Sequence, residues 1–111
     1  MTGSDVAHRL FDFLDQHAFK PVLSARPESY SEAQREILRS AQADAQRVRA
    51  RLDAHTSAAE LYRSFHEVLA SADSRRLHAR LHELGLPALD DVRIDFEQMA
   101  SDLGIGTSGA L

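Results

Sequence analysis

The sequence contains no cysteine. This absence excludes a disulfide framework, a zinc site built from thiolates and a cysteine nucleophile. Proline and glycine are scarce, with three and five among 111 residues, so few positions interrupt regular structure. No run approaches the roughly 20 apolar residues that a membrane-spanning helix needs. The opening "MTGSDVAHRL" also lacks the basic-then-apolar pattern of a secretory signal. We therefore expect a cytoplasmic location and no membrane partner.

The charge balance is mildly acidic. The formal net charge is −4, and the basic residues are twelve arginines and a single lysine. This balance argues against general affinity for nucleic acid or for an anionic membrane surface. Hydrophobic residues make up 43% and charged residues 27%, which is the profile of a globular chain and not of a disordered one. A chain of 111 residues is expected to form one domain.

Apolar residues recur at helical spacing along most of the chain. The alternation of Val92, Ile94 and Phe96 is compatible with a short strand, but that strand would have no partner. We predict an all-α domain of four to five helices, packed as a bundle or with orthogonal crossings. The expected helices are 5–18, 30–54, 57–72, 75–84 and 91–103, within a single domain over 1–104 that is followed by a flexible tail over 105–111.

Capping patterns set the expected helix starts. Ser29-x-x-Glu32 and Ser57-x-x-Glu60 both have the form of a capping box, in which each side chain satisfies an unpaired backbone N–H. We expect these two boxes to open the second and third helices. For the last helix, an aspartate at 90 or 91 is the expected cap.

Proline and glycine set the expected helix ends. Pro21 is expected to end the first helix, because the residue before a proline avoids helical dihedrals. The connection that follows is expected to be non-helical, with Phe19 and Val22 packed onto the core. Gly85 and Gly104 are expected to take the left-handed C′ position after the fourth and fifth helices.

The apolar stripe changes direction around "SADS" at 71–74. Leu77 and Leu81 lie roughly 140° around the helix from the preceding apolar set, at about 100° per residue. Either the segment breaks the chain, with Asp73 or Ser74 as a new cap, or one long helix buries two faces. We favour the break, because Ser-Asp-Ser is typical of a helix start. The second alternative would need another partner, such as a second copy of the chain.

Two histidines in "HARLHE", His78 and His82, are four positions apart. On a helix this spacing places both imidazoles on one face, as in half of a metal site. A metal site normally needs three or four ligands, and neither zinc-protease order of histidine and glutamate is present. We therefore interpret the pair as surface histidines, with metal or small-ligand binding at His78 and His82 as the alternative function. Further ligands from His8, His55 or His66 would need an arrangement that the sequence does not reveal.

The segment 32–53 is rich in arginine, which suggests nucleic-acid binding. Arg35 and Arg39 share a helix face, but the arginines at 47, 49 and 51 scatter around the circumference among acidic residues. Mixed signs at this spacing are typical of a solvated face with modest ion pairs. We therefore do not expect nucleic acid among the partners, and a DNA-associated regulator is the second alternative.

Motifs for enzyme chemistry are absent. The stretch "GIGTSG" at 104–109 matches the dinucleotide fingerprint G-x-G-x-x-G, but that motif functions only between a strand and a helix. No nucleophile elbow or phosphate-binding loop is present. The sequence therefore favours a protein that is not an enzyme, and we expect no cofactor.

Excess apolar surface without a catalytic motif predicts a non-enzymatic interaction or regulatory module. The helix expected over 30–54 is much longer than that over 5–18, so part of its apolar stripe has no obvious neighbour in the chain. We predict self-association through helix faces, with a second copy or another helical protein as partner. The candidate interaction residues are Ile37, Ala41, Val48, Leu52, Leu77 and Leu81.

Overall fold

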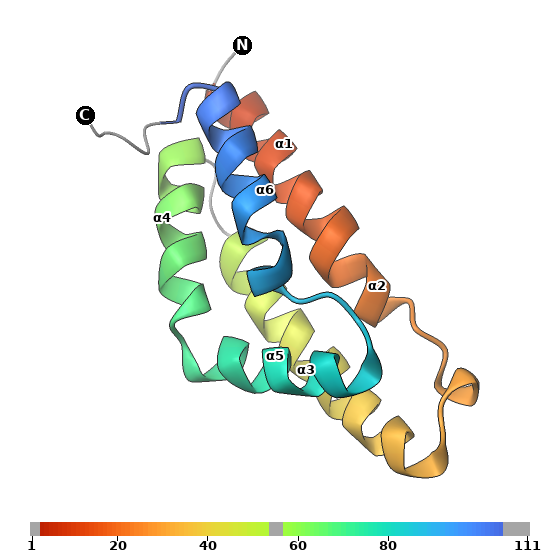
Figure 1. The fold of residues 1–111 in the computed structure, drawn as a ribbon. Helices are drawn as coiled ribbons and strands as arrows, with labels where there is room; N and C mark the ends of the chain where they lie inside the picture. Colours follow the sequence, from red (N-terminus) through yellow and green to blue (C-terminus); the bar gives the residue numbers. More distant parts are fainter. Residues whose placement is uncertain (1–2, 54–56, 106–111) are drawn as a thin grey trace.

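The computed structural model describes residues 3–53 and 57–105, and the regular structure in these ranges is entirely helical (Figure 1). The predicted all-α class is confirmed. The helices are α1 (Gly3–Leu14), α2 (Lys20–Leu23), α3 (Glu32–Asp53), α4 (Ala58–Leu69), α5 (Ala72–Leu84) and α6 (Leu89–Asp102). A π-helical turn, Asp15–Phe19, joins α1 to α2, and a 3-10 turn, Pro27–Ser29, precedes α3. Apart from Ile105, the predicted tail lies outside the described residues.

The helical path of the first segment continues through Pro21, so the predicted end before this proline is wrong. Inside an α-helix, a proline removes a hydrogen bond and clashes with the carbonyl four residues earlier. Here the wider π-helical turn comes first, and Pro21 falls in the first turn of α2, where its missing N–H is not needed. The predicted packing of the connection is confirmed, because Phe19 and Val22 are buried.

The start of α3 lies two residues beyond the predicted capping box. The Ser31 side chain accepts the N–H of Gln34 at 3.3 Å, and the Gln34 side chain accepts the N–H of Ser31 at the same distance. The predicted box of Ser29 with Glu32 is therefore wrong, since Ser29 belongs to the preceding 3-10 turn. The same four-residue pattern occurs twice here, at 29–32 and 31–34, and the turn set by the proline at 27 selects the second.

A break separates α4 from α5, as the change in the apolar stripe predicted. The side chain of Ser57 accepts the N–H of Glu60 at 3.4 Å, which confirms the start of α4. The side chain of Ser71 accepts the N–H of Ser74 at 3.2 Å and caps α5. The cap is therefore Ser71 and neither Asp73 nor Ser74, because the chain turns as soon as α4 ends.

Left-handed glycines follow α5 and α6, as predicted. Gly85 has φ of 72°, and the N–H of Leu86 donates to the carbonyl of Leu81 at 2.9 Å, the long hydrogen bond of a Schellman motif. Gly104 repeats the motif after α6, with φ of 85°. The chain turns back after the first of these glycines, so that the start of α6 lies near α5 and α6 then runs beside α1 (Figure 1).

The core lies between two sets of helices. The long helix α3 packs against α5, while α1 packs against α4 and α6. In Figure 1, α5 lies across one part of α3, so the arrangement combines near-parallel and crossing helices. The largest fully buried side chains are Phe19, Phe65, Phe96, Leu10, Leu14, Leu38, Leu52, Leu61 and Leu81. None of the described helices is long and apolar enough to cross a bilayer.

The packing of α5 on α3 covers the apolar stripe of α3, for which the sequence showed no obvious neighbour. Of the six candidate interaction residues, Ala41, Val48, Leu52, Leu77 and Leu81 are at most 3% exposed within the single chain. Ile37 is only partly buried and packs against the same core. Because α5 covers the stripe of α3, these five buried side chains offer no surface to a second copy. Self-association itself stays a prediction.

Candidate metal site at the turn between α5 and α6

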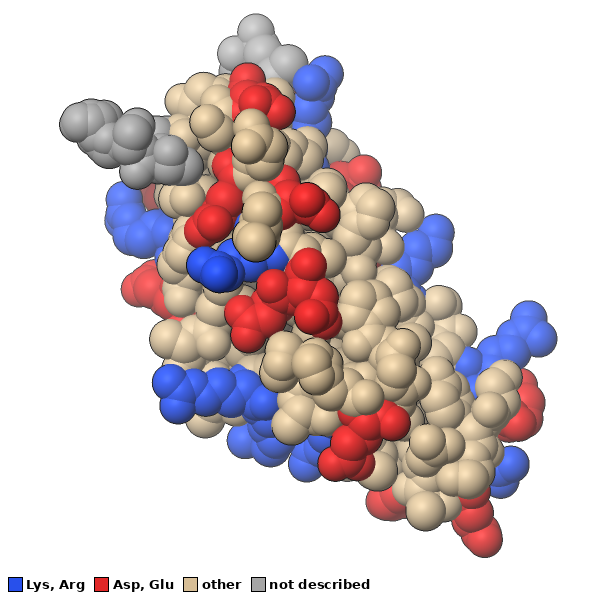
Figure 2. All heavy atoms as spheres, viewed as in Figure 1, with Lys and Arg blue, Asp and Glu red and all other residues tan. Residues whose placement is uncertain are grey.

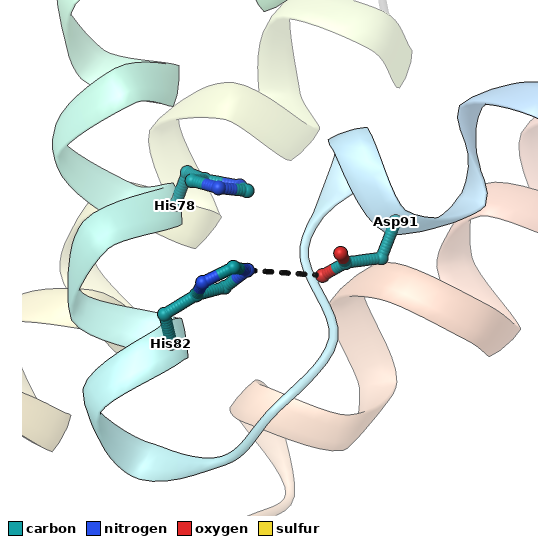
Figure 3. Close-up of side chains that lie close together, drawn as sticks. All are labelled: His78, His82 and Asp91. Atoms are coloured by element: carbon teal, nitrogen blue, oxygen red, sulfur yellow. Dashed lines mark ion pairs between the residues drawn. The ribbon is translucent and has the colours of Figure 1, made fainter.

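The two histidines of "HARLHE" lie on the side of α5 that flanks the core. The buried leucines Leu77 and Leu81 orient α5, and this places His78 and His82 together beside the buried stripe. Their ring centroids are 4.1 Å apart, and their side chains are 32% and 56% exposed. The spacing of four residues therefore produces two adjacent, mutually tilted imidazoles that solvent reaches (Figure 3).

The tight turn after α5 brings a carboxylate to this pair. Helix α6 begins at Leu89, and Asp91 lies in its first turn. The carboxylate of Asp91 accepts the backbone N–H of Ala88 at 2.8 Å, which fixes its direction and caps the helix. The predicted cap at 90 or 91 is thus corrected: the N-cap residue is Ala88, and Asp91 satisfies its N–H from inside the helix.

His78, His82 and Asp91 form a cluster of ligand atoms. The Nε2 atom of His82 lies 3.7 Å from Oδ2 of Asp91. One nitrogen from each imidazole and one carboxylate oxygen all lie within 4.8 Å of one another. Figure 3 shows both rings directed from α5 toward the start of α6. The structure therefore adds to the predicted histidine pair a third potential ligand that the sequence did not supply.

The donor set suits a divalent transition metal ion. Two imidazole nitrogens and one carboxylate oxygen are ligands that Zn²⁺ accepts, and three protein ligands leave a fourth position open. Tetrahedral bonds of about 2.1 Å place donor atoms about 3.4 Å apart. The separation of 3.7 Å between His82 and Asp91 is close to that value. Because the side chain of His82 is 56% exposed, it has room to close onto an ion held beside Asp91.

The other described histidines lie elsewhere. His66 has both ring nitrogens engaged: Nδ1 lies 3.0 Å from the carbonyl oxygen of Tyr62, and Nε2 lies 2.8 Å from the carboxylate of Glu97. His17 is exposed beside the ring of Phe13, and His8 is exposed on α1. The position of His55 lies outside the described residues. Neither His8 nor His66, two of the possible further ligands in the sequence, lies in the cluster with His78 and His82.

The arginines of α3 make separate contacts around the helix. Arg39 pairs with Glu36 at 2.9 Å, and Arg49 of α3 pairs with Asp15 at 2.7 Å. The side chain of Arg35 donates to the carbonyl of Pro27. Basic and acidic side chains are interspersed over the face seen in Figure 2. That face has no continuous basic stripe, the feature typical of nucleic-acid-binding proteins.

A buried carboxylate, which the sequence analysis did not single out, joins α3 to α5. Asp44 is 1% exposed and accepts hydrogen bonds from Arg47, Arg76 and Arg80. Burial opposes its charged form, but the hydrogen bond and charge of Arg76, the hydrogen bond of Arg47 and the charge of Arg80 outweigh burial. The pKa of Asp44 therefore lies below its ordinary value. The signal in the sequence was an acidic residue between Ala41 and Val48 on an apolar stripe.

Comparison of the chain with protein-family models, with curated proteins and with solved structures found no match.

Proposed function

We propose that this domain binds a divalent transition metal ion, Zn²⁺ in the first instance, through His78, His82 and Asp91. One observation carries the proposal. The fold brings a backbone-anchored carboxylate from α6 within 3.7 Å of a histidine pair on α5. Histidine spacing alone is common on helix surfaces, but convergence with a third ligand from another helix meets the minimum that a zinc site needs.

A bound ion would join α5 to α6 across the turn that contains Gly85. Ligands on both sides of this turn make ion binding and the packing of α6 thermodynamically linked, because the site exists only in the folded chain. The proposed role is that of an ion-binding, non-enzymatic domain whose stability depends on the metal. The open fourth position would hold water or a ligand from solution.

The test is a calorimetric titration of the untagged protein with Zn²⁺. We expect one ion per chain, and we expect binding to weaken at least tenfold in His82→Gln and in Asp91→Asn. Asparagine keeps an oxygen that accepts the N–H of Ala88, so this variant preserves the helix cap while removing the charged ligand. His8→Gln is the matched control, since His8 is exposed on α1. No saturable binding to the unmodified chain, or equal affinity in His82→Gln and His8→Gln, would overturn the proposal.

A second candidate function is the predicted self-association, now assigned to a different surface. Ile94 on α6 is 71% exposed, and it is the large hydrophobic residue that the described chain leaves in solvent. Ile94 and Tyr62 line one groove. Tyr62 also lines a neighbouring open cavity of about 560 Å³ between α4 and Ile105. Contiguous exposed apolar surface marks contact sites between proteins, and Ile94 with Tyr62 supplies the apolar part of this groove. We propose a second copy of the chain as the occupant.

Sedimentation velocity at micromolar concentration tests this second candidate. We expect a dimer that dissociates in Ile94→Glu and persists in Arg93→Glu, a change on the same exposed part of α6. A monomer at all concentrations would exclude self-association. A dimer that Ile94→Glu leaves intact would exclude this surface as the contact.

A further inference from the structure

The imidazole of His78 contains a buried atom without a partner. Its Nδ1 is shielded from solvent and makes no hydrogen bond, and it is the one side-chain atom among the described residues in this condition. Most such atoms in folded proteins have a partner, so a polar group close to this nitrogen is a candidate for that role.

The carboxylate of Asp90 lies close to this nitrogen. Its Oδ2 lies 3.8 Å from Nδ1 of His78, beyond hydrogen-bonding distance. The two residues line a small cavity of about 100 Å³ together with Ser74. The Asp90 side chain is 57% exposed and has room to rotate. A movement of about 1 Å brings the two atoms to the length of a hydrogen bond.

Adjacent aspartates at the start of α6 therefore face adjacent imidazoles on α5. Asp90 faces His78, and Asp91 faces His82. Only Asp91 is tied to the backbone N–H of Ala88, so the two carboxylates differ in freedom of movement. This arrangement distributes two tasks over one helical turn: one carboxylate ligates the ion, and the other orients a ligand.

We propose that Asp90 is a positioning residue that accepts the Nδ1–H of His78 and leaves the Nε2 lone pair to bind the metal. The inference rests on the metal site of the proposed function. Histidines that bind metals generally donate their second ring N–H to a carboxylate, a carbonyl or water, and this bond fixes the tautomer and the ring orientation. Asp90 does not contact the ion, and its effect acts through His78.

Zinc affinity of three variants forms the first part of the test. We expect Asp90→Ala to bind one Zn²⁺ per chain with affinity reduced by about 10–100-fold. Asp90→Glu keeps the carboxylate and is expected to recover most of that loss. Asp95→Ala is the control, because this substitution removes the same charge from an exposed aspartate one turn after Asp91 on the same helix. Equal affinities in Asp90→Ala and Asp95→Ala would overturn the inference.

The tautomer of His78 forms the second part and separates positioning from general charge effects. Long-range proton–nitrogen NMR spectra of the metal-free protein in alkaline buffer report which ring nitrogen carries hydrogen. We expect Nδ1–H for His78 in the unmodified chain and in Asp95→Ala, and a mixture of tautomers in Asp90→Ala. A tautomer that Asp90→Ala does not alter would refute the positioning role. Failure of the unmodified chain to bind Zn²⁺ would instead refute the proposed function, and this tautomer measurement would still test the contact.

Discussion

Arg76 of α5 donates its Nε–H to the carboxylate of Asp44 in α3 across 3.3 Å, which joins residues 32 positions apart. The carboxylate is almost completely buried, whereas the side chain of Arg76 is 44% exposed. Arg47 and Arg80 bind the same carboxylate. The longest helix of the domain is therefore attached to α5 by a buried charge as well as by apolar packing. Because α5 also carries the two histidines, this contact helps to position the proposed metal site.

Replacing the buried carboxylate should destabilise the domain. Asp44→Asn removes the charge but retains the approximate shape, so the arginines lose charge-assisted hydrogen bonds, each worth about 1.5–3 kcal/mol. We expect a loss of roughly 2 kcal/mol in the free energy of unfolding, measured by urea denaturation. Glu36→Gln is the control, because the exposed pair of Glu36 with Arg39 should contribute less than about 1 kcal/mol. Equal losses in the two variants would contradict the role assigned to Asp44.

The lowered pKa of Asp44 also predicts how stability depends on pH. A carboxyl group with a folded-state pKa below its unfolded value of about 3.9 releases its proton more readily when folded. Its contribution is therefore fully present above about pH 4 and is lost as the pH falls through the folded pKa. We expect the difference in unfolding free energy between the unmodified chain and Asp44→Asn to be constant near neutral pH and to shrink in acid. A difference that grows in acid would contradict the direction of the pKa shift.

The turn that positions α6 depends on Gly85. At φ of 72°, a residue with a side chain is strained, although a Cβ there would meet no neighbouring atom within 4 Å. We expect Gly85→Ala to cost about 1–2 kcal/mol, because the left-handed conformation carries that penalty for residues other than glycine. Gly85→Asn should cost less, since asparagine visits this conformation more readily. Urea denaturation of both variants checks the order, and a larger loss for asparagine than for alanine would contradict it.

Zinc should raise the thermal stability of the domain. A ligand at about 100 times its dissociation constant stabilises the folded state by about 2.7 kcal/mol. For a domain of this size the corresponding rise in Tm is roughly 10 °C or more. We expect this rise in the unmodified chain and in His8→Gln, and its loss in His82→Gln. A Tm that zinc leaves unchanged, or raises equally in all three proteins, would contradict binding at the proposed site.

Helix periodicity and capping chemistry predicted most of the fold. The break before α5 followed from a change of phase in the apolar stripe together with "SADS", and the left-handed glycines followed from their position after a periodic segment. The wrong predictions concern the exact residue at which a helix begins or ends. Pro21 is tolerated because a π-helical turn precedes it, and Ser31 replaces Ser29 as a cap because a 3-10 turn comes first. Sequence patterns do not distinguish such alternatives, which differ by small energies.

The candidate site was only half predictable. His78 and His82 are linked by helical spacing, which can be read from the sequence, but Asp91 reaches them through a reversal of the chain. The direction that the chain takes after a turn depends on tertiary packing. No local sequence pattern therefore identifies Asp91 as the third potential ligand. Asp44 was missed for a related reason. Its burial depends on three arginine partners, two of them more than 30 positions away.

Anomalous diffraction at the zinc absorption edge, from crystals of the untagged protein grown with one equivalent of Zn²⁺, tests the central claim most directly. The account predicts one strong peak between α5 and α6, about 2.0–2.2 Å from a ring nitrogen of His78, a ring nitrogen of His82 and a carboxylate oxygen of Asp91. A map without a peak at these residues, or with its only peak beside His66 and Glu97, would contradict it.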